Sequence, residues 1–103
     1  SLKEKVGKTF YFETSVDDWK YYNENGIVAH IDISHLKLTK KPHVQASIHG
    51  HSGNWAVSGS NSIYDLKPES FSIYIRWSAG GPLTIEQAKE YGWYLSYAVT
   101  SLD

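Results

Sequence analysis

The chain has 103 residues and a mass of 11.7 kDa, the size of one domain with a single hydrophobic core. Ten Lys and Arg residues balance eleven Asp and Glu residues, and this net charge of −1 argues against nucleic acid as a partner, because binding phosphates requires a basic face. The lack of cysteine excludes disulfides and thiolate metal sites, and no apolar run reaches the ~20 residues of a membrane-spanning helix, so membrane insertion is not expected.

Apolar and polar residues alternate along most of the chain, and this period of two is typical of β-strands. In "FSIYIRW", residues 71–77, the apolar side chains share one face, while Ser72, Tyr74 and Arg76 share the other. In chain order we expect a weak strand at 8–14, strong strands at 27–33 and 43–49, a weak strand at 62–66, and strong strands at 71–77 and 93–99. One apolar face per strand predicts two antiparallel sheets packed face to face.

Two segments carry helical signals. Residues 15–26, "SVDDWKYYNENG", allow one helical turn with Trp19 and Tyr22 three positions apart. "TIEQAKEYG" predicts a helix of about two turns, with Thr84 as N-cap, Gln87 as capping-box partner and Gly92 as the stop. The predicted fold is therefore all-β: an antiparallel six-stranded β-sandwich with one short helix in a strand connection. Residues 1–103 are expected to form this single binding domain, and the lack of an initiating Met suggests that it is excised from a longer protein.

Two histidines lie two positions apart at the end of the 43–49 strand, in "SIHGHSGNW". Such a pair can place two imidazoles on one metal ion, and His30 or His43 from a neighbouring strand position would be the third ligand. The alternatives are that His49 and His51 bond to loop backbone at the strand end, or that they contact a ligand.

The loop that follows, "GHSGNWAVSGSNS", is rich in Ser, Gly and Asn and holds a single large ring. Short donors and acceptors suit sugar hydroxyls, and an aromatic ring suits the apolar face of a sugar, so Asn54 and Trp55 are candidate sugar contacts. The alternative is an ordinary loop in which Trp55 folds back on the edge of the sandwich.

Arg76 and Tyr74 share the polar face of the 71–77 strand, and Trp77 ends it. A guanidinium offers five donors in a planar fork and can bridge vicinal hydroxyls or a carboxylate. A cross-strand ion pair or a subunit contact is the alternative for this arginine.

The sequence gives little support for an enzyme, and no cofactor is expected. Glycosidases need two acids flanking the bond at a defined separation. The acids here fall mostly in turns and helix ends: Asp17, Asp18, Glu69, Glu86 and Glu90. Nucleophile-elbow, phosphate-loop and HExxH motifs do not occur in the sequence.

Three segments share a pattern with a known family. "KKPHVQASI" (40–48) has a proline followed by an apolar strand. "SIYDLKPESFSIYIRW" (62–77) has a short strand, a turn and an aromatic-led strand that ends near a tryptophan, and "GWYLSYAVTS" (92–101) is a last strand of alternating aromatics. Together these segments resemble the H-type lectin domains, the family of the snail agglutinins and discoidin C-terminal domains, and they are also similar to phage tail-fibre tips.

The resemblance implies a six-stranded sandwich, a trimer, and a sugar site in loops near the protomer boundary. This chain departs from the family at three places. Ser78 follows Trp77 where the family often has a sugar-binding histidine, Ser62 occupies the best match for an arginine that reaches the neighbouring site, and the connection 79–92 is longer than usual. The family's sugar specificity is therefore not implied.

We expect an extracellular or surface-displayed adhesive module that binds carbohydrate without covalent chemistry and gains strength from multivalency. The candidate ligand-binding residues are His49, His51, Asn54, Trp55, Arg76 and Trp77. The alternative is a protein interaction or oligomerisation module without a small ligand. A metal site at the histidine pair is the third interpretation.

Overall fold

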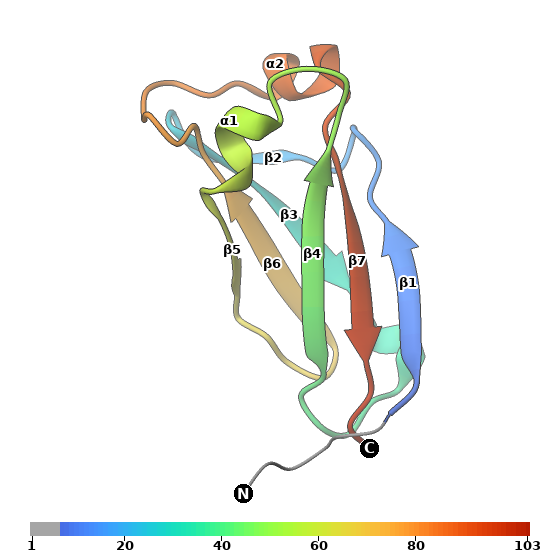
Figure 1. Cartoon of the computed structure of the whole chain (residues 1–103). Helices are drawn as coiled ribbons and strands as arrows, with labels where there is room; N and C mark the ends of the chain where they lie inside the picture. The colour runs from blue at the N-terminus through green and yellow to red at the C-terminus, as the bar shows by residue number, and fades with distance from the viewer. Residues whose placement is uncertain (1–6) are drawn as a thin grey trace, which may run out of the picture.

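A computed structural model describes residues 7–103, and the first six residues of the predicted domain lie outside it. Seven strands form two antiparallel sheets that pack face to face as a β-sandwich (Figure 1). The three-stranded sheet has the order β1-β7-β4, with β1 at Thr9–Glu13, β4 at His43–His49 and β7 at Tyr94–Thr100. The four-stranded sheet has the order β2-β3-β6-β5, with β2 at Lys20–Asn23, β3 at Gly26–Asp32, β5 at Asn61–Tyr64 and β6 at Ser70–Ile75. The predicted fold class is confirmed.

The predicted alternation is confirmed by burial, because the apolar faces of both sheets meet in one core. Ile73 of β6, Leu95 of β7 and Val99 of β7 are all at most 1% exposed. Register places Ala29 and Ile63 on either side of Ile73, so neighbouring strands present apolar side chains to the same face. The opposite faces of the two sheets are left for polar and aromatic side chains.

The strand count differs from the prediction, because residues 20–23 form β2 and not a helical turn. Val16 and Asp17 form a turn, and the chain then pairs with β3 through Lys20↔Val28 and Tyr21↔Ile27. Aromatic residues fit well beside a neighbouring strand, and this pairing outweighs the weak helical spacing of the segment. The prediction of a helical turn with Trp19 and Tyr22 on one side was therefore wrong.

The predicted helix is confirmed as α2, Ile85–Glu90, and its capping box is complete. Gln87 N donates to Thr84 Oγ1 at 3.0 Å, and Thr84 N donates to Gln87 Oε1 at 2.9 Å. Gly92 has a φ of +68°, the left-handed conformation that suits glycine after a helix.

Two short helical elements were not predicted. A second helix, α1, at Trp55–Ser58 lies inside the segment predicted to be a loop, and a 3₁₀ turn, η1, occupies Ser34–Leu36. Both α1 and α2 lie at one end of the sandwich (Figure 1). Neither α1 nor α2 is long and apolar enough to cross a membrane, and no other described helix is.

Candidate functional site

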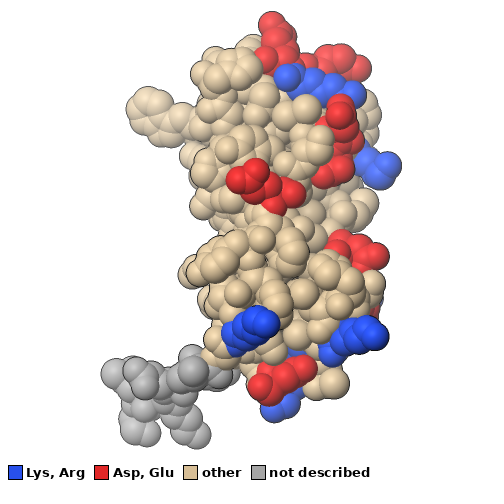
Figure 2. All heavy atoms as spheres, turned by 90° about the vertical axis from the view of Figure 1, so that its right-hand side faces the viewer, with Lys and Arg blue, Asp and Glu red and all other residues tan. Residues whose placement is uncertain are grey.

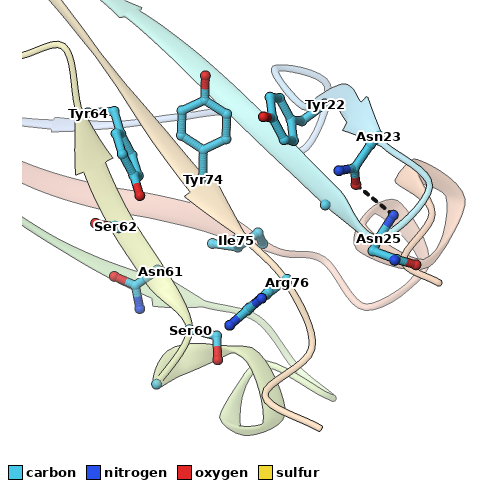
Figure 3. A pocket seen from close by; sticks show the side chains of 12 residues that line it. Tyr22, Asn23, Asn25, Ser60, Asn61, Ser62, Tyr64, Tyr74, Ile75 and Arg76 are labelled. Atoms are coloured by element: carbon cyan, nitrogen blue, oxygen red, sulfur yellow. Dashed lines mark hydrogen bonds between the residues drawn. The ribbon is translucent and has the colours of Figure 1, made fainter. Parts of the chain in front are cut away.

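A groove of about 680 Å³ lies on the outer face of the four-stranded sheet (Figure 3). Side chains from β2, β5 and β6 line it, together with the turn between β2 and β3 and the residues that follow α1. Its lining combines three tyrosines with amides, hydroxyls and one guanidinium. We call this surface the tyrosine groove.

Tyr22, Tyr74 and Tyr64 form a row of rings across the tyrosine groove. The Tyr22 and Tyr74 centroids lie 5.1 Å apart at an interplanar angle of 87°, and the Tyr64 and Tyr74 centroids lie 5.1 Å apart at 83°. This edge-to-face packing fixes each ring against its neighbour. Tyr22 and Tyr64 nevertheless remain 65% and 55% exposed, so the row offers aromatic surface to a ligand.

Short polar side chains occupy the rest of the groove. Asn23 accepts a hydrogen bond at Oδ1 from the backbone N–H of Asn25 at 2.8 Å, which shapes the turn between β2 and β3. On the β5 side, Asn61 donates to the carbonyl of Ser58 and so anchors the start of the strand to the end of α1. Ser60 lies beside Asn61 and completes this polar border (Figure 3).

Arg76 follows the last residue of β6 and lies at the end of the groove that adjoins α1. Its side chain extends toward Ser60 and Asn61 (Figure 3). Among residues 7–103, no carboxylate pairs with this guanidinium, since the one ion pair found there joins Lys89 and Asp17. The cross-strand ion pair considered for Arg76 from the sequence is therefore not formed within the described chain.

His49 lies on the outer face of the other sheet. Its Nε2 hydrogen-bonds with Ser96 Oγ at 2.7 Å, and its ring stacks on Tyr94 with centroids 5.0 Å apart and planes 15° apart. Ser96 and Tyr94 belong to the neighbouring strand β7, so these contacts hold His49 along the sheet. It does not line the tyrosine groove.

His51 is exposed, and its backbone N–H donates to the carbonyl of Tyr91 at 3.0 Å. The glycine between the two histidines has a packing role, because a Cβ at Gly50 would come 2.6 Å from Trp93 Cδ1. Close approach of the backbone to Trp93 therefore explains this glycine without a metal ion.

The third ligands considered for a metal site are remote from the histidine pair. His43 lies at the opposite end of β4 from His49, about 20 Å away along an extended strand. His30 belongs to the other sheet, where its Nδ1 hydrogen-bonds with Ser72 Oγ at 2.8 Å. In residues 7–103 no three His, Cys, Asp or Glu side chains gather closely enough to hold one ion.

Asn54 and Trp55 begin α1. Asn54 is the N-cap residue, but its side chain makes no capping hydrogen bond. Trp55 is 91% exposed, so it does not fold back on the sandwich edge as the alternative interpretation had it. This ring is free to contact a partner, but it lines a different part of the surface from the tyrosine groove.

Trp77 packs against the buried Trp93, with ring centroids 5.2 Å apart at 76°. Its indole N–H donates to the carbonyl of Pro82 at 3.0 Å. The ring is half-buried, and its contacts hold the connection between β6 and α2 in place.

Of the six site residues predicted from the sequence, Arg76 is the one that lines the tyrosine groove.

Sequence reasoning placed Tyr74 on a polar strand face but missed Tyr22 and Tyr64 as its neighbours. The face of Tyr22 could not be assigned while its segment was interpreted as helical. Tyr64 alternates with Ile63 in a short strand, and that alternation was the available signal for an outward-facing ring.

No family model matches this chain, and neither a curated protein nor a solved structure matches it.

Proposed function

We propose that this domain binds carbohydrate non-covalently in the tyrosine groove. The observation that carries the proposal is the row of three tyrosines, packed edge to face and partly exposed, beside amide and hydroxyl side chains. Sugars combine apolar C–H faces with many hydroxyls, and therefore require aromatic surface next to short donors and acceptors. The ligand set of the proposal is Tyr22, Tyr64, Tyr74, Asn25, Asn61 and Arg76.

Binding at one groove is expected to be weak, because few ligand atoms contribute and each adds at most ~1.5 kcal/mol. An adhesive role on a cell or particle surface gains strength when several grooves engage one glycan-bearing surface. We therefore retain a trimer and an extracellular or surface-displayed location as parts of the proposal, in keeping with the H-type lectin resemblance. Light scattering of the purified domain measures the assembly, and a strict monomer would contradict that part.

The proposal is tested on a glycan array, followed by calorimetry with the best-bound glycan. Tyr22→Ala and Tyr64→Ala should each weaken binding roughly two- to tenfold, since each removes one ring of the row. Tyr11→Ala is the matched control, because Tyr11 is 80% exposed on the other sheet and should leave affinity unchanged. Absence of binding to any glycan, or equal losses in all three variants, would contradict the proposed function.

Two exposed rings outside the groove favour a second candidate, a protein interaction or oligomerisation module. Tyr11 is 80% and Trp55 91% exposed, and large exposed aromatics are enriched where proteins meet. If this candidate is correct, Trp55→Ala or Tyr11→Ala lowers the molecular mass measured by light scattering. Trp55→Ala also tests the predicted sugar contact at α1. If Trp55 contacts the glycan, this variant reduces glycan binding without changing assembly.

A further inference from the structure

The charge distribution of the tyrosine groove is one-sided. Arg76 is the single charged side chain that lines it, and no Asp or Glu from residues 7–103 joins it there. The face in Figure 2, by contrast, shows acidic and basic side chains at both of its ends.

We propose that the groove selects an acidic saccharide, one whose sugar ring carries a carboxylate that Arg76 binds. The inference rests on the proposed function and adds the class of ligand to it. A guanidinium presents parallel N–H donors in a plane, and a carboxylate accepts two such bonds at once. In the described chain no protein carboxylate fills that position, so a ligand carboxylate is the complementary partner.

The spacing in the groove accommodates one charged ring beside an uncharged one. Tyr74 lies on β6 and Arg76 follows it by two positions, just past the end of the strand, which separates the two residues by roughly 7 Å if the chain stays extended. A sugar ring at Arg76 would therefore have its neighbour in the oligosaccharide over the tyrosine row. Ser60 and Asn61 lie on the β5 side of Arg76, where they can bond hydroxyls of the charged ring.

The presence of a single cation also limits the charge of the ligand. Polyanions such as nucleic acids need several Lys or Arg side chains along their path. No lysine and no second arginine from residues 7–103 lines this groove. A ligand with one singly charged anionic group beside neutral hydroxyls therefore matches the single guanidinium and the uncharged polar side chains of the groove.

The test compares carboxylated glycans with matched neutral ones. The probes are sialyllactose against lactose, and trigalacturonate against its methyl ester, with lactose 3-sulfate as a second anion. We expect at least one carboxylated probe to bind the unchanged protein about tenfold or more tightly than its neutral partner at low salt, and the preference to shrink as salt rises. Arg76→Gln should abolish the preference, because the affinity for the carboxylated probe then falls to the affinity that the same variant has for the neutral partner. Arg76→Lys should retain part of it.

Lys41→Ala is the control for net charge, since Lys41 is exposed before β4 and does not line the groove. It should keep the full preference. If the protein binds neutral glycans through the tyrosines and shows no preference for the carboxylated probes, this inference is overturned and the proposed function stands. An Arg76-dependent preference for the sulfate alone would overturn the carboxylate assignment. Absence of binding to every probe, acidic and neutral, on this set and on the array would overturn both proposals.

Discussion

Trp93 joins three separate parts of the chain. Its indole N–H donates to the carbonyl of Ser52 at 2.7 Å, and its own carbonyl accepts from Trp19 Nε1 at 3.0 Å. Its ring packs edge-on against Trp77. One buried side chain therefore holds the loop after β4 and the segment after β6 against the start of β7.

We expect Trp93→Phe to lower the free energy of unfolding by about 2–4 kcal/mol. The change leaves the Ser52 carbonyl without its donor and opens a cavity in a site that is 0% exposed. Urea denaturation followed by circular dichroism measures the loss. Trp55→Phe is the control, since Trp55 is almost fully exposed and its replacement should change stability by less than about 0.5 kcal/mol. Equal losses would contradict the role assigned to Trp93.

Residue type alone predicted little of this. Trp77 and His49 are chemically suited to sugar binding, but Trp93 and Ser96 engage them in the folded chain. These partners lie 16 and 47 positions away, at distances that a local pattern does not encode. The chemistry of a residue shows which interactions its side chain can make, and the fold determines the partners of those interactions.

At the scale of elements, α2 was predictable because its signals are local. Thr84, Gln87 and Gly92 mark the start and the end of the helix within nine residues. By contrast, β2 depends on pairing with β3, and its own sequence also allowed a helical turn. Local capping can be predicted from sequence, whereas a strand that forms only because it pairs with a neighbour can be recognised only in the tertiary structure.

Thr84→Ala should cost about 1 kcal/mol of stability, because it removes the hydroxyl that accepts the N–H of Gln87. Thr84→Ser keeps a hydroxyl at the same position and should retain most of the stability. Denaturation midpoints of the two variants measure the difference in stability, provided that the slope of unfolding free energy against denaturant concentration is the same in both. If Thr84→Ser loses as much as Thr84→Ala, the capping bond is not the cause.

The start of α2 also makes stability depend on pH. Glu86 has a pKa below its ordinary value, because its own backbone N–H and the Tyr21 hydroxyl, at 2.9 Å, both donate to its carboxylate. A carboxylate with a lower pKa in the folded state stabilises the fold above its unfolded pKa, and this contribution disappears as pH falls through the folded pKa. Unfolding free energy should therefore drop below about pH 4, and less steeply in Glu86→Gln. A urea series from pH 7 to pH 2 measures both slopes, and identical slopes would contradict the contact.

At the scale of the whole molecule, the sandwich separates stability from recognition. The facing sides of the two sheets form the core, which period-two patterning predicted well. The outer faces are free to carry function, and register decides which side chains meet there. The tyrosine groove combines β2, β5 and β6, and their lateral order follows from pairing across the sheet, which a single sequence does not display.

The central claim is that a glycan occupies the tyrosine groove, and a titration of isotope-labelled protein with the best-bound array glycan tests it most directly. We expect amide and side-chain NMR shifts to change together at Tyr22, Asn25, Asn61, Tyr64, Tyr74 and Arg76, with saturation at one affinity. His49, His51 and Tyr11 should keep their signals, because they lie on other surfaces. Shift changes centred on His49, His51 and Trp55, with the tyrosine row unaffected, would contradict the claim.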